Sequence, residues 1–211
     1  MLQVGNLSAV TGTFNVPNIT KVPAGGNSSI EYVGAAWVGL DGVGCEGPTG
    51  LRSLLQTSNH WSFDRWGVND SANYAVYERC PALPENWDWE SISISAGDVI
   101  KATVHATSPT SRIATLENLT TKQTVKHEFN RAQALCFETA EWIVESLKPV
   151  SNSRFFDFGT FEFSNAYTAL AIGNAPSVVD TQTWNVWRDN IPLTNCTILG
   201  STNIKCTYLE S

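Results

Sequence analysis

The chain has 211 residues, of which 42% are hydrophobic and only 16% are charged, and 13 basic against 20 acidic residues give a formal net charge of −7. Nucleic acid and anionic membranes are therefore poor candidates as partners, because both select a basic surface. The length suits one all-β domain as well as two small ones. No linker or repeat is evident, so we expect a single domain over residues 1–211.

Short apolar runs recur along the chain, and several of them alternate with polar residues in the period of two that is typical of strands. No amphipathic pattern of about 10 or more residues predicts a helix. Strands without crossover helices predict an all-β fold, an antiparallel sandwich or barrel. In chain order the predicted strands are Ala36–Asp41, Leu54–Thr57, Ser91–Ser95, Asp98–Ala106, Ile113–Glu117, Thr124–Phe129, Ala140–Glu145 and Phe156–Phe163.

Turns and loops are predicted between these strands. Residues 118–123 read as a hairpin turn, and Cys80–Trp87 reads as a rigid loop marked by two prolines. No stretch of about 18 apolar residues predicts a transmembrane helix. The start of the chain also lacks the basic and then apolar pattern of a signal peptide, so we interpret Met1 as the start of a mature fragment.

Two of the predicted strands carry polar groups on one face and apolar groups on the other. In Ala36–Asp41, residues Trp37, Gly39 and Asp41 share a face, and the opposite face should enter the core. In Ala140–Glu145, Glu141 lies on the face opposite Trp142. In the predicted strand Leu54–Thr57, Gln56 lies on the face opposite Leu55. A lone polar residue on a strand most often meets only solvent. Two segments patterned alike favour a site, although the period cannot show that they meet.

Cysteines and glycosylation sequons indicate a secreted protein. Cys196 and Cys206 bracket a short segment and could close a local disulfide, and a bridge from Cys45 to Cys136 would join the segments before Gln56 and Glu141. Spacing alone does not fix the connectivity, and Cys80 would be left over. The possible N-glycosylation sites are Asn6, Asn18, Asn27, Asn69, Asn118 and Asn195.

Other familiar motifs carry little weight. Gly42–Gly47 matches the G-x-G-x-x-G dinucleotide fingerprint, but Pro48 follows where a helix should begin, so we interpret it as a loop between strands. The three histidines are isolated, and no G-x-S-x-G elbow is present. There is no C-x-x-C or paired-histidine spacing, so we expect no metal and no cofactor.

Several stretches together resemble the glutamic peptidase family, the eqolisins of fungi. No single stretch is specific for the family, but the combination is, because three of the stretches occur in the family's order. These are Trp37–Gly42, Leu55–Thr57 and Cys136–Glu145. The remaining stretches are Thr11–Pro17, Tyr77–Glu78, Ile94–Lys101, Leu116–Thr121 and Phe156–Gly159. The chain departs from the family pattern in its opening strand, in a longer segment between Asp41 and Gln56, and in its end from Trp184 to Cys206.

The resemblance implies a β-sandwich of two large curved antiparallel sheets, of concanavalin-like or jelly-roll architecture, and a secreted endopeptidase active at acid pH. Carried over by position, it makes Gln56 and Glu141 the catalytic pair. It places Trp37, Asp41 and Glu78 in or behind the cleft, and it makes a Cys45–Cys136 disulfide plausible. The partners would be polypeptide substrates, and we expect a monomer.

The mechanism that follows is direct attack of water on a peptide carbonyl. Glu141, as a carboxylate, would take a proton from the water and deliver it to the leaving amine. Gln56 would donate its amide N–H to the oxyanion and remain neutral in acid. A general base must remain partly ionised in acid, so we expect Glu141 to have hydrogen bonds that stabilise its charge or a polar setting, with Asp41 and Glu78 as candidates for neighbours.

Two alternatives belong to other classes. A polysaccharide-cleaving glycoside hydrolase would pair Glu141 with Glu145 or Glu78 across the scissile bond. A carbohydrate-binding β-sandwich module would instead use exposed tryptophans as stacking platforms. The candidate platforms are Trp37, Trp61, Trp66, Trp87 and Trp89.

Overall fold

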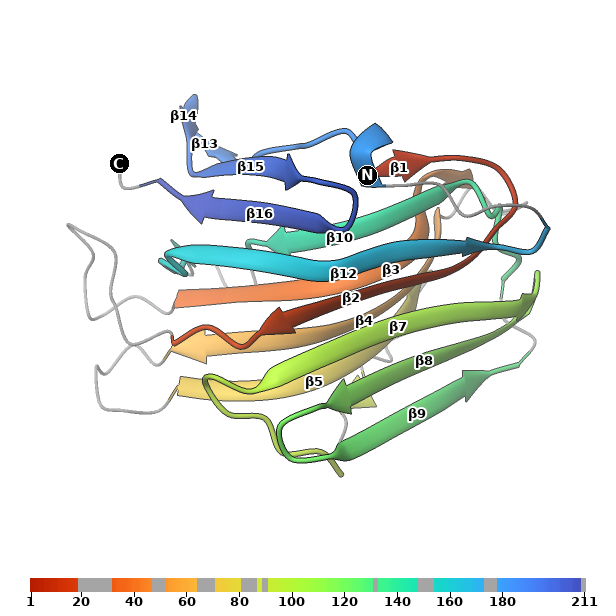
Figure 1. Cartoon of the computed structure of the whole chain (residues 1–211), viewed down its shortest axis with the longest axis horizontal. Coiled ribbons are helices and arrows are strands. Elements are labelled where there is room, and N and C mark those ends of the chain that lie inside the picture. The colour runs from red at the N-terminus through yellow and green to blue at the C-terminus, as the bar shows by residue number, and fades with distance from the viewer. Residues whose placement is uncertain are drawn as a thin grey trace.

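The computed structural model describes residues 1–18, 32–46, 52–63, 71–80, 87–88, 91–130, 133–147, 154–172 and 178–209. For residues 52, 60, 62–63, 71–80 and 87–88 the description is of the backbone alone. The described chain forms two large stacked sheets (Figure 1).

The first sheet carries the segments that the sequence singled out. Its seven strands follow the spatial order β1–β10–β3–β4–β5–β6, with β11 pairing with β3 from outside this path. All pairs are antiparallel except β11–β3, which is parallel and makes the sheet mixed. The strands are β1 (Leu2–Gln3), β3 (Tyr32–Glu46), β4 (Arg52–Phe63), β5 (Ser71–Cys80), β6 (Trp87–Asp88), β10 (Thr139–Glu145) and β11 (Arg154–Phe155).

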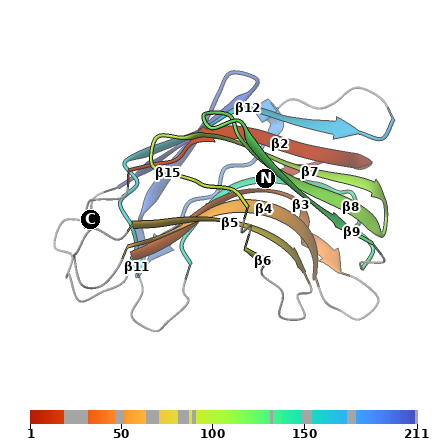
Figure 2. The same ribbon diagram turned by 90° about the horizontal axis from the view of Figure 1, so that it is seen from below.

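The second sheet has seven antiparallel strands in the order β15–β16–β12–β2–β7–β8–β9. Figure 2 shows the two sheets as curved layers stacked on each other. The strands are β2 (Leu7–Asn15), β7 (Val99–Ser108), β8 (Ser111–Asn118), β9 (Gln123–Phe129), β12 (Thr160–Leu170), β15 (Thr194–Leu199) and β16 (Asn203–Tyr208). A short 3₁₀ helix, η1 (Val178–Asp180), and a separate hairpin, β13 (Trp187–Arg188) with β14 (Ile191–Pro192), precede β15.

The core lies between the sheets and follows from the alternation of side chains. In β8 every second residue is buried, and in β3 the predicted core residues Val38 and Leu40 are fully buried. Trp61 of β4 is also fully buried and packs against Phe156 and Phe161, with ring centroids 5.3 and 5.8 Å apart. Burial of such aromatic area is the largest favourable contribution that one side chain makes to the core.

The all-β sandwich predicted from the sequence is confirmed. Strands appear where Asp98–Ala106, Ile113–Glu117, Thr124–Phe129 and Ala140–Glu145 predicted them, and a turn joins β8 to β9. Among the described residues no helix is long and apolar enough to cross a membrane.

Two predicted strands are wrong. Ser91–Ser95 pairs with no strand because side chains bind its backbone: Asn118 donates to the Ser93 carbonyl, and Asp98 accepts from the Ser95 N–H. Phe156–Phe163 is a strand only from Thr160 onward. Before it, Gly159 adopts a φ of +62° and donates to Asp157, so the chain turns there.

Candidate active site

Glu141 and Gln56 lie in one row across the first sheet. Glu141 on β10 pairs with Gly39 on β3, Gly39 pairs with Gln56 on β4, and Gln56 pairs with Glu78 on β5. Directly paired residues project from the same face of a sheet, so the two side chains share a face, about 10 Å apart at their Cα atoms. Gln56 is 6% exposed and Glu141 is 4% exposed, so neither lies on an open solvated surface.

Gly39 has no side chain, and neighbouring side chains pack over its Cα between Gln56 and Glu141. A Cβ at this position would come within 2.7 Å of Cζ3 of Trp37 and 3.1 Å of Cδ1 of Leu54. The Trp37 indole therefore lies over the glycine, and its Nε1 donates a 2.9 Å hydrogen bond to Glu145 Oε2. Trp37 thus lies beside the pair, and it joins β3 to β10 through a side-chain contact.

Asp41 fixes the segment that leads into β10. Its carboxylate is fully buried and accepts from four consecutive backbone N–H groups, those of residues 136–139, at 2.8 to 3.3 Å. The Cys45–Cys136 disulfide ties the same two segments together covalently. Both contacts set where β10 begins, and therefore where Glu141 stands against Gly39. The side chain of Glu78 lies outside the described residues, as does that of Cys80.

The Glu141 carboxyl is held close to a glycine turn of β3. Asp41 and Gly42 have φ values of +65° and +115°, and this turn directs the Val43 N–H to the carboxyl, where it donates a hydrogen bond. A Cβ on Gly42 would lie 3.5 Å from Glu141 Oε2, so the turn and the carboxyl are in near contact. Oε1 of Glu141 has no hydrogen-bond partner within the described part of the chain.

Burial raises the pKa of Glu141 from 4.5 to about 7. The positive charge of the Met1 ammonium lowers this pKa, the negative charge of Asp41 raises it, and the Val43 hydrogen bond lowers it. The same burial lowers the pKa of the Met1 ammonium. The sequence led us to expect Glu141 to remain partly ionised in acid, but burial favours its neutral form, because desolvation outweighs the groups that stabilise the carboxylate.

A cavity of about 620 Å³ opens beside Glu141. Its walls come from the Trp37–Glu145 side of the first sheet, from residues 181–189 and Leu193, which precede β15, and from residues of β15 and β16. Gln56 is not part of this lining, so the cavity extends from Glu141 away from Gln56.

The structure also describes the second predicted disulfide, the possible metal ligands and part of the tryptophans. The Cys196–Cys206 disulfide is present between β15 and β16. No cluster of His, Cys, Asp or Glu that could hold a metal occurs among the described residues. Trp61 is buried in the core, so it cannot be a stacking platform for sugars, and Trp66 and Trp89 lie outside the described residues, as does the side chain of Trp87.

The sequons divide in the same way. Asn6, Asn18 and Asn195 are exposed, and Asn27 and Asn69 lie outside the described residues. The prediction of a surface sequon is wrong at Asn118, which is 1% exposed. Its amide nitrogen donates to the Ser93 carbonyl and to Asp98, so it is occupied by protein contacts.

Sequence reasoning missed four features of the site. Gly39 was placed on the polar face, but its position between Gln56 and Glu141 required the register. The Val43 N–H and the Met1 ammonium are backbone groups, which leave no residue-type signal. The wall formed by residues 181–194 was also missed, although its closely spaced Trp184 and Trp187 are visible in the sequence.

Comparison with known proteins decides the family. Residues 1–208 match the model of the peptidase A4 family. The chain belongs to this family. It is therefore a glutamic, or eqolisin, acid endopeptidase, and thus a hydrolase.

Relatives agree over nearly the whole length of the chain. The peptidase is 34% identical to aspergillopepsin-2 of Aspergillus niger over 216 residues, covering 95% of this chain and 72% of that protein. It is 35% identical to scytalidopepsin B of Scytalidium lignicola over 213 residues, covering 97% and 74%.

Solved structures share the fold. Scytalido-glutamic peptidase with a transition state analog inhibitor superposes with a TM-score of 0.81 at 33% identity, covering 99% of this chain and 95% of that one. SCP-B, a member of the eqolisin family in a complex with the tripeptide Ala-Ile-His, gives 0.77 at 33% identity, with the same coverage. Aspergilloglutamic peptidase from Aspergillus niger gives 0.72 at 36% identity, covering 84% and 99%.

Proposed function

We propose that Gln56 and Glu141 are the catalytic pair of this acid endopeptidase. The observation that carries the proposal is the row Glu141–Gly39–Gln56, in which a glycine separates two buried polar side chains on one face. Gly39 adds no side chain between the two groups, so the Trp37 indole can lie over it and form the floor beside them. Trp37 and Asp41 act as positioning residues, because they hold the floor and the start of β10.

The raised pKa of Glu141 changes the order of proton transfer. At acid pH its carboxyl is neutral, so it has both a hydroxyl that donates and a carbonyl oxygen that accepts. The hydroxyl gives its proton to the carbonyl oxygen of the scissile peptide bond. Water then adds to the carbonyl carbon and gives its proton to the other oxygen of Glu141, which is neutral again.

Collapse of the resulting gem-diol uses the same carboxyl. Glu141 donates its proton to the peptide nitrogen, the C–N bond breaks, and one hydroxyl of the gem-diol returns a proton to Glu141. The products are a carboxylic acid and an amine, and the enzyme regains its starting state. Gln56 donates its amide N–H to the oxygen of the former carbonyl while its own carbonyl orients the water, and it does so without changing charge.

Separate replacements of the two residues test the pair. Gln56→Ala should lower kcat by about 10²–10³, as loss of one oxyanion donor does. Glu141→Gln should abolish turnover, because an amide cannot exchange the proton. Digestion of a denatured protein at acid pH measures both, and an aspartic-peptidase inhibitor should not affect the parent. If either variant digests the protein as fast as the parent, the assignment is wrong.

We further propose that the chain is a single-domain, monomeric and secreted enzyme. Both disulfides support an oxidising compartment. The proposed catalytic residues all come from one chain, so activity requires no second copy. Size-exclusion chromatography with light scattering tests the monomer, and a mass that doubles at assay concentration would contradict it.

A further inference from the structure

The cavity beside Glu141 has a wall made of backbone. The β1 strand pairs with β10 only at Thr139 and Ala140, so among the described strands none covers the outer edge of β10 beyond Ala140. The N–H and C=O groups of a strand point to alternate edges, and Val4 donates to the Glu138 carbonyl on this edge. The backbone groups of Trp142 and Val144 therefore face the open edge.

The side chains of these two residues support this orientation. Trp142 and Val144 are 6% and 8% exposed, and the Trp142 indole donates to the Thr11 carbonyl in the core. Both nevertheless line the cavity. Since their side chains point into the sandwich, what they present to the cavity is the edge of the strand.

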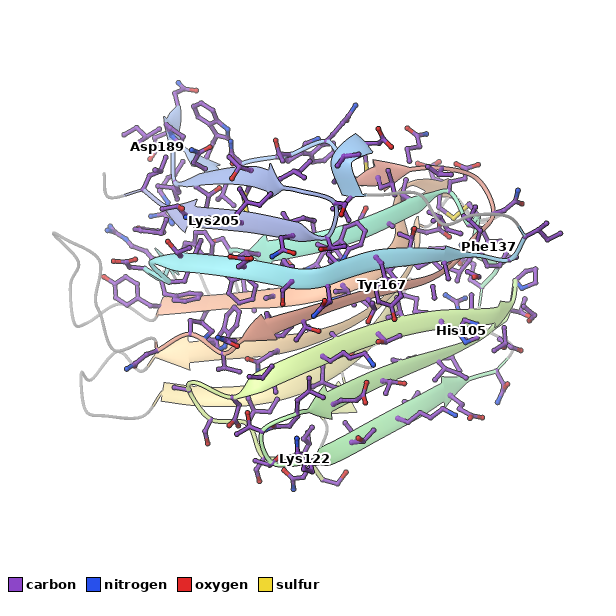
Figure 3. The ribbon with its side chains drawn as sticks, viewed as in Figure 1. His105, Lys122, Phe137, Tyr167, Asp189 and Lys205 are labelled. Atoms are coloured by element: carbon purple, nitrogen blue, oxygen red, sulfur yellow. A yellow bond between two sulfur atoms is a disulfide. The ribbon has the colours of Figure 1, made fainter. Side chains whose placement is uncertain are left out.

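The opposite wall contains a hairpin and is held by hydrogen bonds within the segment. The β13–β14 hairpin turns at Asp189 and Asn190, whose positive φ values of 49° and 64° are those that tight hairpins adopt. The Val186 N–H donates to Thr194 Oγ1, and the Leu193 N–H donates to the Val186 carbonyl. Figure 3 shows Asp189 on this hairpin, away from Tyr167 on β12.

Two tryptophans on this wall are exposed to solvent. Trp184 and Trp187 line the cavity, and they are 60% and 61% exposed. Exposed indoles are costly in water and are enriched where a protein binds a partner. The cavity also contains Glu141, so whatever the indoles bind is continuous with the reacting bond.

We propose that this cavity is the subsite for the leaving-amine half of a polypeptide substrate, and that Trp184 and Trp187 select a large apolar side chain there. The inference rests on the proposed function, in which Glu141 delivers its proton to the leaving nitrogen. The substrate runs as an added strand along the open edge of β10, a common way of binding extended peptides. Its apolar side chain packs against the two indoles.

Cleavage-site profiling tests this subsite. The parent and a Trp184→Ala/Trp187→Ala variant digest one peptide library at acid pH, and mass spectrometry identifies the cleaved bonds. The parent should favour Phe, Leu or Tyr at one of the first two positions after the scissile bond. In the variant, kcat/KM for a matched peptide with Phe at that position should fall about tenfold or more, while the peptide with Ala there is cleaved as before.

Matched variants separate the possible causes. Tyr167→Ala removes an aromatic residue that is 49% exposed on the other sheet, and it should keep the parent profile. Trp187→Leu keeps an apolar surface and tests the subsite even where the double variant folds poorly. A parent without the preference, or a Trp184→Ala/Trp187→Ala variant that retains it, overturns the inference while the catalytic assignment stands. Full activity of Glu141→Gln would instead overturn the proposed function.

Discussion

Replacing Glu141 by Gln should increase the stability of the protein relative to the parent as the pH rises. The stability of the variant minus that of the parent should be larger at neutral pH than at acid pH. A carboxyl with a folded pKa of about 7 and an ordinary value of 4.5 binds its proton more tightly in the folded state. Below pH 4.5 both states are protonated and the carboxyl adds no cost. Between pH 4.5 and 7 the unfolded chain ionises first, so the free energy of unfolding falls as pH rises.

The size of this effect follows from the two pKa values. Their difference corresponds to about 3 kcal/mol, fully present above pH 7 and absent below pH 4.5. The neutral Gln side chain carries no such cost. The stability of Glu141→Gln minus that of the parent should therefore rise by about 3 kcal/mol between pH 4 and pH 7.

Urea unfolding followed by tryptophan fluorescence measures this difference, and the chain has 8 tryptophans. An active peptidase digests its own unfolded chains, so both proteins should carry Gln56→Ala. Glu162→Gln on β12, an exposed carboxyl of the other sheet, is the control, and its difference from the parent should stay constant over this range. A difference for Glu141→Gln that is equal at pH 4 and pH 7 would refute the assigned burial of this carboxyl.

Three further changes test the frame of the site. Removing the Cys45–Cys136 bridge, which closes a separation of 91 residues, should cost about 4 to 5 kcal/mol of unfolding free energy in urea; a loss below about 1 kcal/mol would contradict it. Asp41→Asn should lower the thermal midpoint and also the pKa of Glu141, seen as an activity decline at lower pH; an unchanged pH profile would count against this. Gly39→Ala should reduce kcat/KM by displacing Trp37, and normal kinetics would show that the packing of Trp37 over Gly39 is not needed.

Local pattern alone predicted much of the fold. Alternation of apolar and polar residues identified most strands and the buried face of β3, because the two-residue period of a strand follows from covalent geometry. It failed at Ser91–Ser95, where Asp98 and Asn118 bind the backbone in place of a neighbouring strand. Side-chain hydrogen bonds of this kind depend on residues that the fold brings together. The two-residue period of the sequence does not reveal them.

The sequence by itself determined the resemblance to the family, the residue types of the proposed catalytic pair and the strands that carry them. Only the tertiary structure decided that Gly39 lies between Gln56 and Glu141, because the register of three strands is a long-range property. Only the structure showed that the pKa of Glu141 is raised, because the desolvation comes from surrounding atoms that lie far away in the chain. This raised pKa changed the protonation state that we propose for Glu141 in acid. For the same reason the tryptophans of residues 181–194 became part of the site only when the chain folded back to the open edge of β10.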